Sequence, residues 1–240
     1  MAFSRVDKKL EIMTKAVILA AGVGSRFNSL KPKSLSQLNV TTTVLNHQIK
    51  YLSSRIGLEN IWIVVGYKKN IIQKKFPKLN FVHNPKYLST NTSKSLLLAL
   101  EKIDDDVLCL AGDIYFDEEV LDLILSSNHS ACIVDKKECG NEEMKYNLYD
   151  NGFIRKLSKM LKYPEGEAIG IDLIKKNDLD LFREELKFLD DKDYFSKGLD
   201  NLIRQKKLKL LPIYIGNLFC MEFDYPHEFK KIKQFLKRNH

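Results

Sequence analysis

Short apolar runs rich in β-branched residues alternate with segments of helical periodicity along the first half of the chain, and this alternation constrains the fold most strongly. Such runs predict strands, and the periodic segments predict the helices between them. The expected strands are residues 16–20, 61–65, 81–83, 107–111 and 131–134, and the expected helices are residues 44–54, 70–76, 92–103 and 118–126. Strand–helix–strand units in series predict an α/β fold with a doubly wound, mostly parallel sheet of the Rossmann-like type.

The rhythm changes after Asp135. Residues 144–149 and 153–157 flank the turn sequence Asp150-Asn151-Gly152, which predicts a β-hairpin that a plain βαβ series would not contain. The remaining elements are expected as helices over residues 173–185 and 194–205, a strand over 209–214, a further segment over 217–223 and a terminal helix from Pro226. No flexible linker interrupts them, so we expect residues 15–240 to form a single domain, with residues 1–14 as an N-terminal extension.

The composition is that of an ordinary globular protein, with 44% hydrophobic and 29% charged residues. The net charge is +8, but the lysines are scattered rather than gathered among aromatic residues, so nucleic acid is not an expected partner. The four cysteines include no CxxC pair, which favours a reducing cytoplasm without structural zinc. Because no apolar run reaches membrane-spanning length and no signal peptide is recognisable, we expect a cytoplasmic protein with no membrane partner.

The segment after the first expected strand carries the clearest chemical signal. It runs Leu19-Ala20-Ala21-Gly22-Val23-Gly24-Ser25-Arg26 and continues to Lys33. The glycines allow a backbone whose N–H groups approach phosphate oxygens, while Arg26 and Lys33 add charge and hydrogen-bond donors. A dinucleotide fingerprint needs a third glycine where Phe27 stands, and a P-loop needs Gly-Lys-Ser/Thr. A triphosphate-binding loop is therefore expected, against the alternative of a tight turn beside a solvated Arg26.

Three carboxylates are candidates for holding a metal ion. Asp113 follows the expected strand 107–111, at the end of the sheet where doubly wound folds bind their ligands. Glu222 and Asp224 alternate with Phe223, so both face one side if this segment is extended. Oxygen ligands of this kind suit Mg²⁺. The alternatives are a turn or helix-capping role for Asp113 and an exposed strand face for the other two.

Taken together, these residues resemble a known family. Residues 16–26, followed by Pro32-Lys33, resemble the signature of nucleoside-diphospho-sugar and phosphocholine-type nucleotidyltransferases. The resemblance continues in order and spacing through Val64-Val65-Gly66-Tyr67, Asn84-Pro85-Lys86-Tyr87, Leu110-Ala111-Gly112-Asp113 and Met221-Glu222-Phe223-Asp224. It implies a GT-A type nucleotidyltransferase that releases pyrophosphate, with Mg²⁺ on Asp113, Glu222 and Asp224 and with the hairpin covering the acceptor site. The catalytic residues are then Arg26, Lys33, Asp113 and Lys159.

The nucleotide site implied by this resemblance combines the loop residues with two polar side chains. Asn91 and Ser95 are four positions apart at the start of an expected helix, so both could face a pyrimidine edge. Their spacing with Tyr87 resembles that of cytidylyltransferases and favours CTP. Helix capping by Asn91 or Thr92 is the alternative role. The expected nucleotide-binding residues are Leu19, Ala20, Ala21, Gly22, Gly24, Arg26, Lys33, Asn91 and Ser95.

The acceptor site is expected around the hairpin. Lys159 resembles the lysine that these enzymes place after the hairpin to pair with the acceptor phosphate; an exposed lysine is the alternative, and Arg155 and Lys162 are substitutes. A quaternary ammonium such as that of phosphocholine needs ring faces or an acidic neighbour. Tyr115 and Tyr194 are the acceptor-binding candidates, with Phe116 and Tyr149 as further rings and Glu167, Asp172 and Asp193 as nearby acids.

Several functions stay open at this point. The expected reaction joins CTP to a small, phosphocholine-like phosphorylated metabolite, and the alternatives within the class are a sugar-1-phosphate, a polyol phosphate or a phosphonate. A non-catalytic nucleotide-binding module and a basic nucleic-acid-binding protein are alternatives from other classes. The five histidines have no metal-binding spacing. A homodimer is left open by the sequence.

Overall fold

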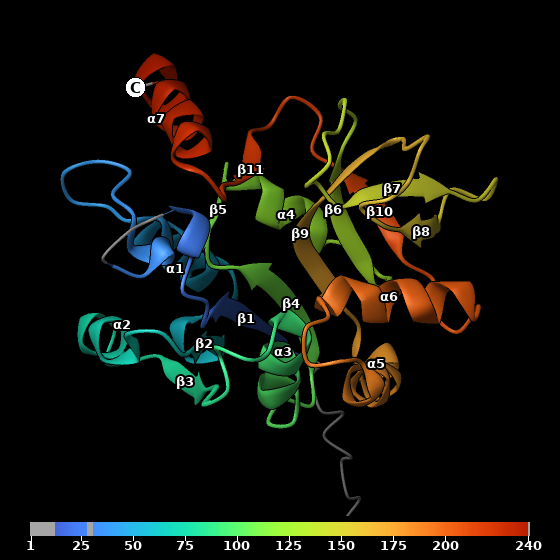
Figure 1. Ribbon diagram of the computed structural model, residues 1–240, viewed down its shortest axis with the longest axis horizontal. Helices are drawn as coiled ribbons and strands as arrows, with labels where there is room; N and C mark the ends of the chain where they lie inside the picture. Colours follow the sequence, from blue (N-terminus) through green and yellow to red (C-terminus); the bar gives the residue numbers. More distant parts are fainter. Residues whose placement is uncertain (1–12, 28–30, 240) are drawn as a thin grey trace, which may run out of the picture.

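The computed structural model describes residues 13–27 and 31–239 and shows an α/β fold built on one large sheet (Figure 1). Along its main path the strands follow the order β10, β6, β9, β4, β1, β2, β3. Their bounds, in that order, are Leu211–Tyr214, Ala131–Asp135, Gly166–Ile174, Asp106–Ala111, Thr14–Ala20, Ile61–Val65 and Asn80–His83. Every pairing along this path is parallel except the two made by β9, so the predicted mostly parallel sheet is confirmed.

Helices cover both faces of the sheet because its central strands are apolar on both sides. Strand β1 sends Val17 and Leu19 into one core and Ala16 and Ile18 into the other. The first core is closed by α3 (Thr92–Leu100), α5 (Lys176–Phe188) and α6 (Phe195–Arg204). The second core is closed by α1 (Val44–Ile56), α2 (Lys69–Lys75) and α4 (Glu119–Leu125).

Strand β9 corrects the sequence-based prediction of a helix over residues 173–185. Leu173 belongs to this strand, and the helix α5 begins only at Lys176. β9 lies between β4 and β6 and runs antiparallel to both. Gly170 and Asp172 interrupt its apolar run, which hid the strand from periodicity analysis, whereas pairing on both sides stabilises it regardless of local preference. As a result, β9 carries its side chains to the centre of the sheet.

The predicted hairpin corresponds to β7 (Lys145–Leu148) and β8 (Ile154–Leu157), which pair antiparallel. β7 also pairs with β9, so the hairpin extends the large sheet at its side. Tyr146 and Ile154 are buried in the first core, and α6 packs against β8. The hairpin is thereby held rigidly next to the strand β9.

A second, two-stranded sheet joins distant parts of the chain. β5 (Ile114–Phe116) directly follows β4 and pairs antiparallel with β11 (Cys220–Glu222). Neither was predicted as a strand, because each has only three residues and depends on its partner. The helix α7 (Pro226–Asn239) follows β11 and packs on Phe223 through Phe229 and Ile232. This pairing brings the C-terminal carboxylates next to the end of β4.

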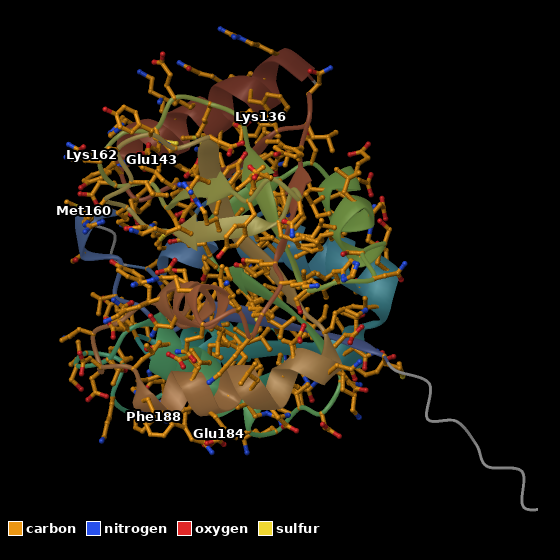
Figure 2. The ribbon with its side chains drawn as sticks, turned by 90° about the vertical axis from the view of Figure 1, so that its right-hand side faces the viewer. Lys136, Glu143, Met160, Lys162, Glu184 and Phe188 are labelled. Atoms are coloured by element: carbon orange, nitrogen blue, oxygen red, sulfur yellow. The ribbon has the colours of Figure 1, made fainter. Side chains whose placement is uncertain are left out.

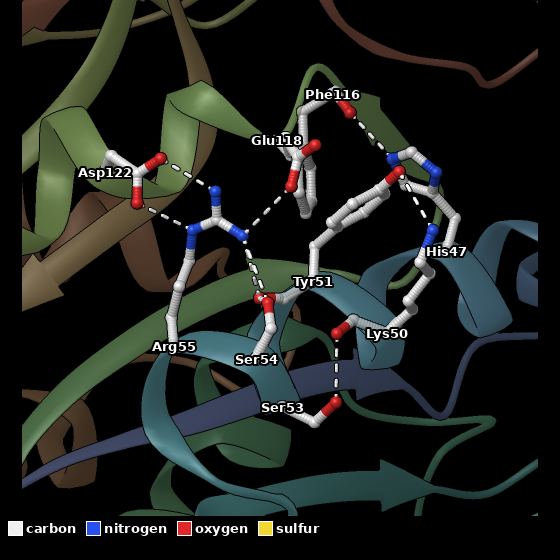
Figure 3. Close-up of polar contacts among 9 residues, drawn as sticks. All are labelled: His47, Lys50, Tyr51, Ser53, Ser54, Arg55, Phe116, Glu118 and Asp122. Carbon is white, nitrogen blue, oxygen red and sulfur yellow. Dashed lines mark hydrogen bonds and ion pairs between the residues drawn. The ribbon is translucent and has the colours of Figure 1, made fainter.

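Polar contacts from α1 fix the segment that follows β4 (Figure 3). His47 Nε2 donates a hydrogen bond of 2.7 Å to the carbonyl oxygen of Phe116. Arg55 contacts Asp122 through two hydrogen bonds of 2.7 Å each and reaches Glu118 at 3.4 Å. α1 therefore ties β5 and α4 together on one side of the site.

The predicted N-terminal extension lies almost entirely outside the described residues, and its last residue, Thr14, already belongs to β1. Over residues 13–27 and 31–239, no helix combines the length and the apolar character needed to cross a membrane.

Candidate active site

A cavity of about 490 Å³ opens at the carboxyl ends of β1 and β4. Its walls come from the loop after β1, the end of β4, the strand β9, the segments flanking the hairpin, the N-termini of α3 and α6, and the segment around β11. Ligands of doubly wound folds bind at this edge of the sheet. The position of the cavity therefore agrees with the site expected from the sequence.

The glycine loop lines the cavity through Leu19, Ala20, Gly22, Gly24 and Arg26. Gly24 has a φ of 65°, a left-handed conformation that favours glycine. With this backbone the loop follows the edge of the cavity, which Gly22, Gly24 and Arg26 all line.

Among the loop residues predicted to bind the nucleotide, Ala21 does not line the cavity. Its side chain is buried, and its carbonyl oxygen accepts a 2.9 Å hydrogen bond from the backbone N–H of Tyr67. The prediction that Ala21 contacts the nucleotide is therefore not supported by its position. Instead, it anchors the loop to the segment after β2.

Lys33 connects two carboxylates at the floor of the cavity. Its Nζ lies 2.6 Å from Asp113 Oδ2 and 2.6 Å from Asp224 Oδ1. Burial by itself would lower the pKa of Lys33, but the charges and hydrogen bonds of the two carboxylates outweigh it and raise the pKa. Arg26 Nη1 reaches Asp224 at 3.1 Å. The two predicted cations thus converge on Asp224.

Asp113, Glu222 and Asp224 come together as predicted, each offering one oxygen within 4.8 Å of the others. Although Glu222 is accessible from the cavity, its surroundings raise its pKa well above the usual range, through desolvation first and then through the charges of the other two carboxylates. For Asp224, desolvation opposes ionisation, but Lys33 outweighs it and lowers the pKa. Three converging carboxylate oxygens fit a hard divalent cation, which would also relieve their mutual repulsion.

Gln48 fixes the backbone on both sides of Asp113. Its Nε2 donates hydrogen bonds to the carbonyl oxygens of Ala111 at 2.9 Å and Ile114 at 2.8 Å. Because the Gln48 side chain is fully buried, these bonds are shielded from water. Sequence analysis missed this residue, since it lies mid-helix far from Asp113 in the chain.

Asn91 and Ser95 were predicted together, but only Asn91 lines the cavity. Asn91 also caps α3, since its Oδ1 accepts a 2.8 Å hydrogen bond from the N–H of Thr92, so both predicted roles are compatible. Ser95 is buried below the cavity wall, and its Oγ accepts a 2.9 Å hydrogen bond from Asn84 Nδ2. In this structure Ser95 therefore makes an internal contact one turn beyond Asn91 and does not line the cavity.

Lys159 and Tyr194 both line the cavity, as predicted for the acceptor site. Lys159 Nζ lies 5.2 Å from the Tyr194 ring centroid, a cation–π contact, and 3.6 Å from Glu142 Oε2. The substitutes lie elsewhere: Arg155 Nε contacts Asn147 at 3.4 Å, and Lys162 lies at the outer surface beside Met160 (Figure 2). Lys159 is therefore the cation that this segment turns toward the cavity.

Tyr115 is the acceptor-site candidate that the structure places away from the cavity. It lies outside the cavity, where its ring packs against His47 at a centroid distance of 4.5 Å and against the ring of Phe219 at 5.8 Å. Burial raises the pKa of its hydroxyl to about 12. The reason is the orientation of β5, which turns this ring toward α1 and α7.

The cavity wall also includes residues that the sequence did not single out, together with two of the acids expected near the acceptor. Lys137 and Glu167 form an ion pair on the cavity wall, and Met144, Leu157 and Phe195 supply apolar surface. Asp172, from β9, also lines it. Glu167 and Asp172, two of the acids expected near the acceptor, reach the cavity because β9 carries both of them into the sheet.

Comparison with known proteins agrees with this geometry. Residues 16–176 match the family described as the MobA-like NTP transferase domain. The chain belongs to this family. It is therefore a nucleotidyltransferase by its domain, and the sequence-based resemblance is confirmed.

Two relatives indicate where the chain stands within the class. It is 28% identical to the CTP:phosphoglutamine cytidylyltransferase of Campylobacter jejuni subsp. jejuni, over 87% of this chain and 92% of that protein. It is 30% identical to the CMP-5'-(3-aminopropyl)phosphonate synthase of Streptomyces rubellomurinus, over 51% of this chain. The match spans only 20% of that relative's length.

Two solved structures share the fold. The CTP:phosphocholine cytidylyltransferase of Streptococcus pneumoniae superposes with a TM-score of 0.75 at 20% identity, over 94% of this chain and 100% of that one. The inositol-1-phosphate CTP transferase of T. maritima superposes with a TM-score of 0.77 at 18% identity, over 95% and 96% of the two chains. At these identities the likeness establishes the α/β fold.

Proposed function

We propose that this nucleotidyltransferase transfers CMP from CTP to a small phosphorylated acceptor and releases pyrophosphate. The observation that carries the proposal is Lys33, held between Asp113 and Asp224 in the cavity that the glycine loop lines. The Campylobacter jejuni relative, which is matched over nearly its whole length, is named for CTP and a phosphorylated acceptor. Asn91, on the cavity wall, is the candidate for contacting the base.

The reaction needs positioning and charge neutralisation more than proton transfer. An oxygen of the acceptor phosphate attacks the α-phosphorus of CTP, a new P–O bond forms, and the bond to pyrophosphate breaks. A phosphate dianion is nucleophilic at neutral pH, so no general base is required. Lys33, whose pKa is raised, stays protonated and places its charge beside the phosphates, with Arg26 and the loop N–H groups.

We further propose that the reaction depends on Mg²⁺. Asp113, Glu222 and Asp224 would hold the ion, which when bound neutralises phosphate charge and orients the reacting oxygens. The hydrogen bonds from Gln48 hold the backbone around Asp113 so that its carboxylate stays aimed at the cavity. Lys33 then binds between the carboxylates and the phosphates.

The acceptor is proposed to bind against the part of the cavity wall formed by β9 and the segments flanking the hairpin. Lys159, in contact with Tyr194, is the candidate for its phosphate, and Lys137 adds a second positive charge on the same wall. A phosphocholine-like metabolite is our first expectation, with a phosphonate, a polyol phosphate or a sugar-1-phosphate as alternatives. The two sequence relatives are named for acceptors that carry nitrogen, namely glutamine and aminopropyl groups.

Pyrophosphate release tests the proposal. The protein is incubated with Mg²⁺, one of the four NTPs, and a panel of phosphocholine, 2-aminoethyl phosphate, aminoethylphosphonate and sugar-1-phosphates. We expect release with CTP and at least one acceptor, lost in Asp113→Ala and retained in Asp150→Ala, which changes an exposed aspartate at the hairpin turn.

The outcomes separate the candidate functions. Release with another NTP would overturn the choice of CTP but keep the chemistry. Binding of CTP in calorimetry with no release for any acceptor, with or without the metal, would favour the non-catalytic nucleotide-binding module.

A further inference from the structure

Asp172 is a buried carboxylate on the cavity wall for which the described residues provide no partner. Its side chain is 5% exposed, and it lines the cavity from β9. Across the sheet it stands in register with Cys109 on β4 and Cys132 on β6, both fully buried thiols. Neither thiol hydrogen-bonds to it, and no group within residues 13–27 and 31–239 forms an ion pair with it.

The lack of a hydrogen-bond donor sets Asp172 apart from the other buried carboxylate residues of the described chain. Each of the three has a donor: Asp106 pairs with Lys175, Glu167 pairs with Lys137, and Asp200 accepts a 2.9 Å hydrogen bond from the N–H of Leu157. A carboxylate taken out of water without a donor is costly, and these three residues meet the requirement where Asp172 does not. Burial raises the pKa of Asp172 to about 7.

We propose that Asp172 recognises the acceptor by accepting hydrogen bonds from a protonated amine at the end opposite its phosphate. This rests on the proposed function, and it names the class of acceptor: a small zwitterion that carries an N–H-bearing ammonium group. Lys159 and Lys137 line the cavity and carry positive charge that can pair with the acceptor phosphate. Asp172 lines the same cavity and carries negative charge when it is ionised. Such an amine supplies both the donors and the charge that Asp172 lacks.

The surroundings favour an amine with N–H groups over a quaternary ammonium. A quaternary ammonium donates no hydrogen bonds and is bound chiefly by ring faces. Three aromatic side chains line the described cavity, and each is engaged elsewhere: Tyr194 contacts Lys159, Phe195 is buried in the first core, and Tyr225 stacks on His227. No aromatic cage is therefore present on the described part of the wall.

Matched acceptor pairs test this inference on the intact protein. The pairs are 2-aminoethyl phosphate with 2-hydroxyethyl phosphate, and 3-aminopropyl phosphonate with 3-hydroxypropyl phosphonate; phosphocholine is the quaternary comparison. We expect at least one amine to exceed both its hydroxyl partner and phosphocholine in kcat/KM by on the order of 10- to 100-fold, because the hydroxyl leaves a desolvated carboxylate without its counter-charge.

The variant Asp172→Asn keeps the shape of the side chain and removes its charge. In this variant, kcat/KM for an amine acceptor should come within about threefold of kcat/KM for its hydroxyl partner, mainly because KM for the amine rises. KM for CTP should stay within about twofold of wild type. Asp150→Asn makes the same chemical change at an exposed turn and should leave the ratio unchanged. Equal losses for both acceptors in Asp172→Asn would indicate a structural role and overturn the inference, as would a wild-type preference for the hydroxyl or quaternary compounds.

A binding measurement separates this inference from the proposed function. Calorimetric titration of each acceptor into the protein with CTP but without divalent metal does not depend on turnover. If pyrophosphate is never released but amines still bind at least tenfold more tightly than hydroxyl partners, the proposed function fails and the amine site stands. If Asp172→Asn does not fold, the test uses Asp172→Ser together with the ratio of amine to hydroxyl binding constants measured for the wild-type protein. Equal binding of every pair would overturn the inference.

Discussion

Replacing Asp172 with asparagine should stabilise the unliganded protein at neutral and alkaline pH and change its stability little near pH 4. The carboxyl group is buried without a donor, and its pKa is raised from 3.8 to about 7 by burial. A rise of this size corresponds to roughly 4 kcal/mol between the two protonation states. Asparagine has nearly the same shape and never acquires the charge that the site disfavours.

The direction of this pH dependence follows from the protonation of Asp172 in the folded and in the unfolded chain. Below about pH 4 the carboxyl is protonated in both, so its raised pKa contributes its full stabilisation relative to the ionised state. As pH rises from about 4 to 7, the unfolded chain ionises while the folded one resists, and the stabilisation is lost. The free energy of unfolding of Asp172→Asn minus that of wild type should therefore increase across this window and level off above about pH 7.

Urea unfolding of both proteins at half-unit steps from pH 4 to 8.5 measures this difference. Other titrating groups cancel because they are common to both proteins. Asp150→Asn, at an exposed position, should give a difference that stays flat with pH. A flat difference for Asp172→Asn as well, or one that decreases with pH, would refute the reasoning and would mean that the folded protein supplies Asp172 with a donor.

Three further predictions concern single side chains. Ser95→Ala should lower the free energy of unfolding by about 1 kcal/mol, because Asn84 Nδ2 loses one of its two acceptors, and leave KM for CTP within about twofold; a tenfold rise in KM would support Ser95 as a base contact. Gly66→Ala should destabilise the protein by about 1–3 kcal/mol in thermal unfolding, since the new Cβ would lie 2.6 Å from Tyr87 Cβ; an unchanged midpoint would contradict this. Tyr115→Phe should leave kcat/KM for the acceptor within about twofold in steady-state assays, because the ring lies outside the cavity, and a large rise in acceptor KM would contradict its placement.

The parts of the site that could be predicted depend on residues close together in the chain. Residues 16–20 of the strand Thr14–Ala20 form an uninterrupted apolar run, and the loop that follows has its glycines and Arg26 within a few positions. A fully buried parallel strand must be apolar on both faces, so its sequence identifies it without reference to its partners. The loop is identified in the same way, by backbone requirements that glycine alone meets easily.

Two predicted site residues, Ser95 and Tyr115, lie away from the cavity, because their sequence patterns are compatible with more than one packing arrangement. Asn91 and Ser95 have the spacing of one helical face, but whether that face meets the cavity depends on how α3 packs, and only Asn91 reaches it. Tyr115 follows Asp113 closely, yet the alternation of the strand β5 sends its ring to the opposite side. Spacing gave the relative direction of these side chains, and packing determined what they contact.

By itself, then, the sequence determined the α/β class, the glycine loop at the cavity and the identity of the three converging carboxylates, because these depend on local backbone and residue chemistry. Tertiary structure decided which groups meet: Lys33 and Asp224 are 191 positions apart, and only the pairing of β5 with β11 brings them within 2.6 Å. It also decided that Asp172 lies between two strands with no donor of its own. Long-range strand pairing buries such a group through contacts that no local stretch of sequence encodes.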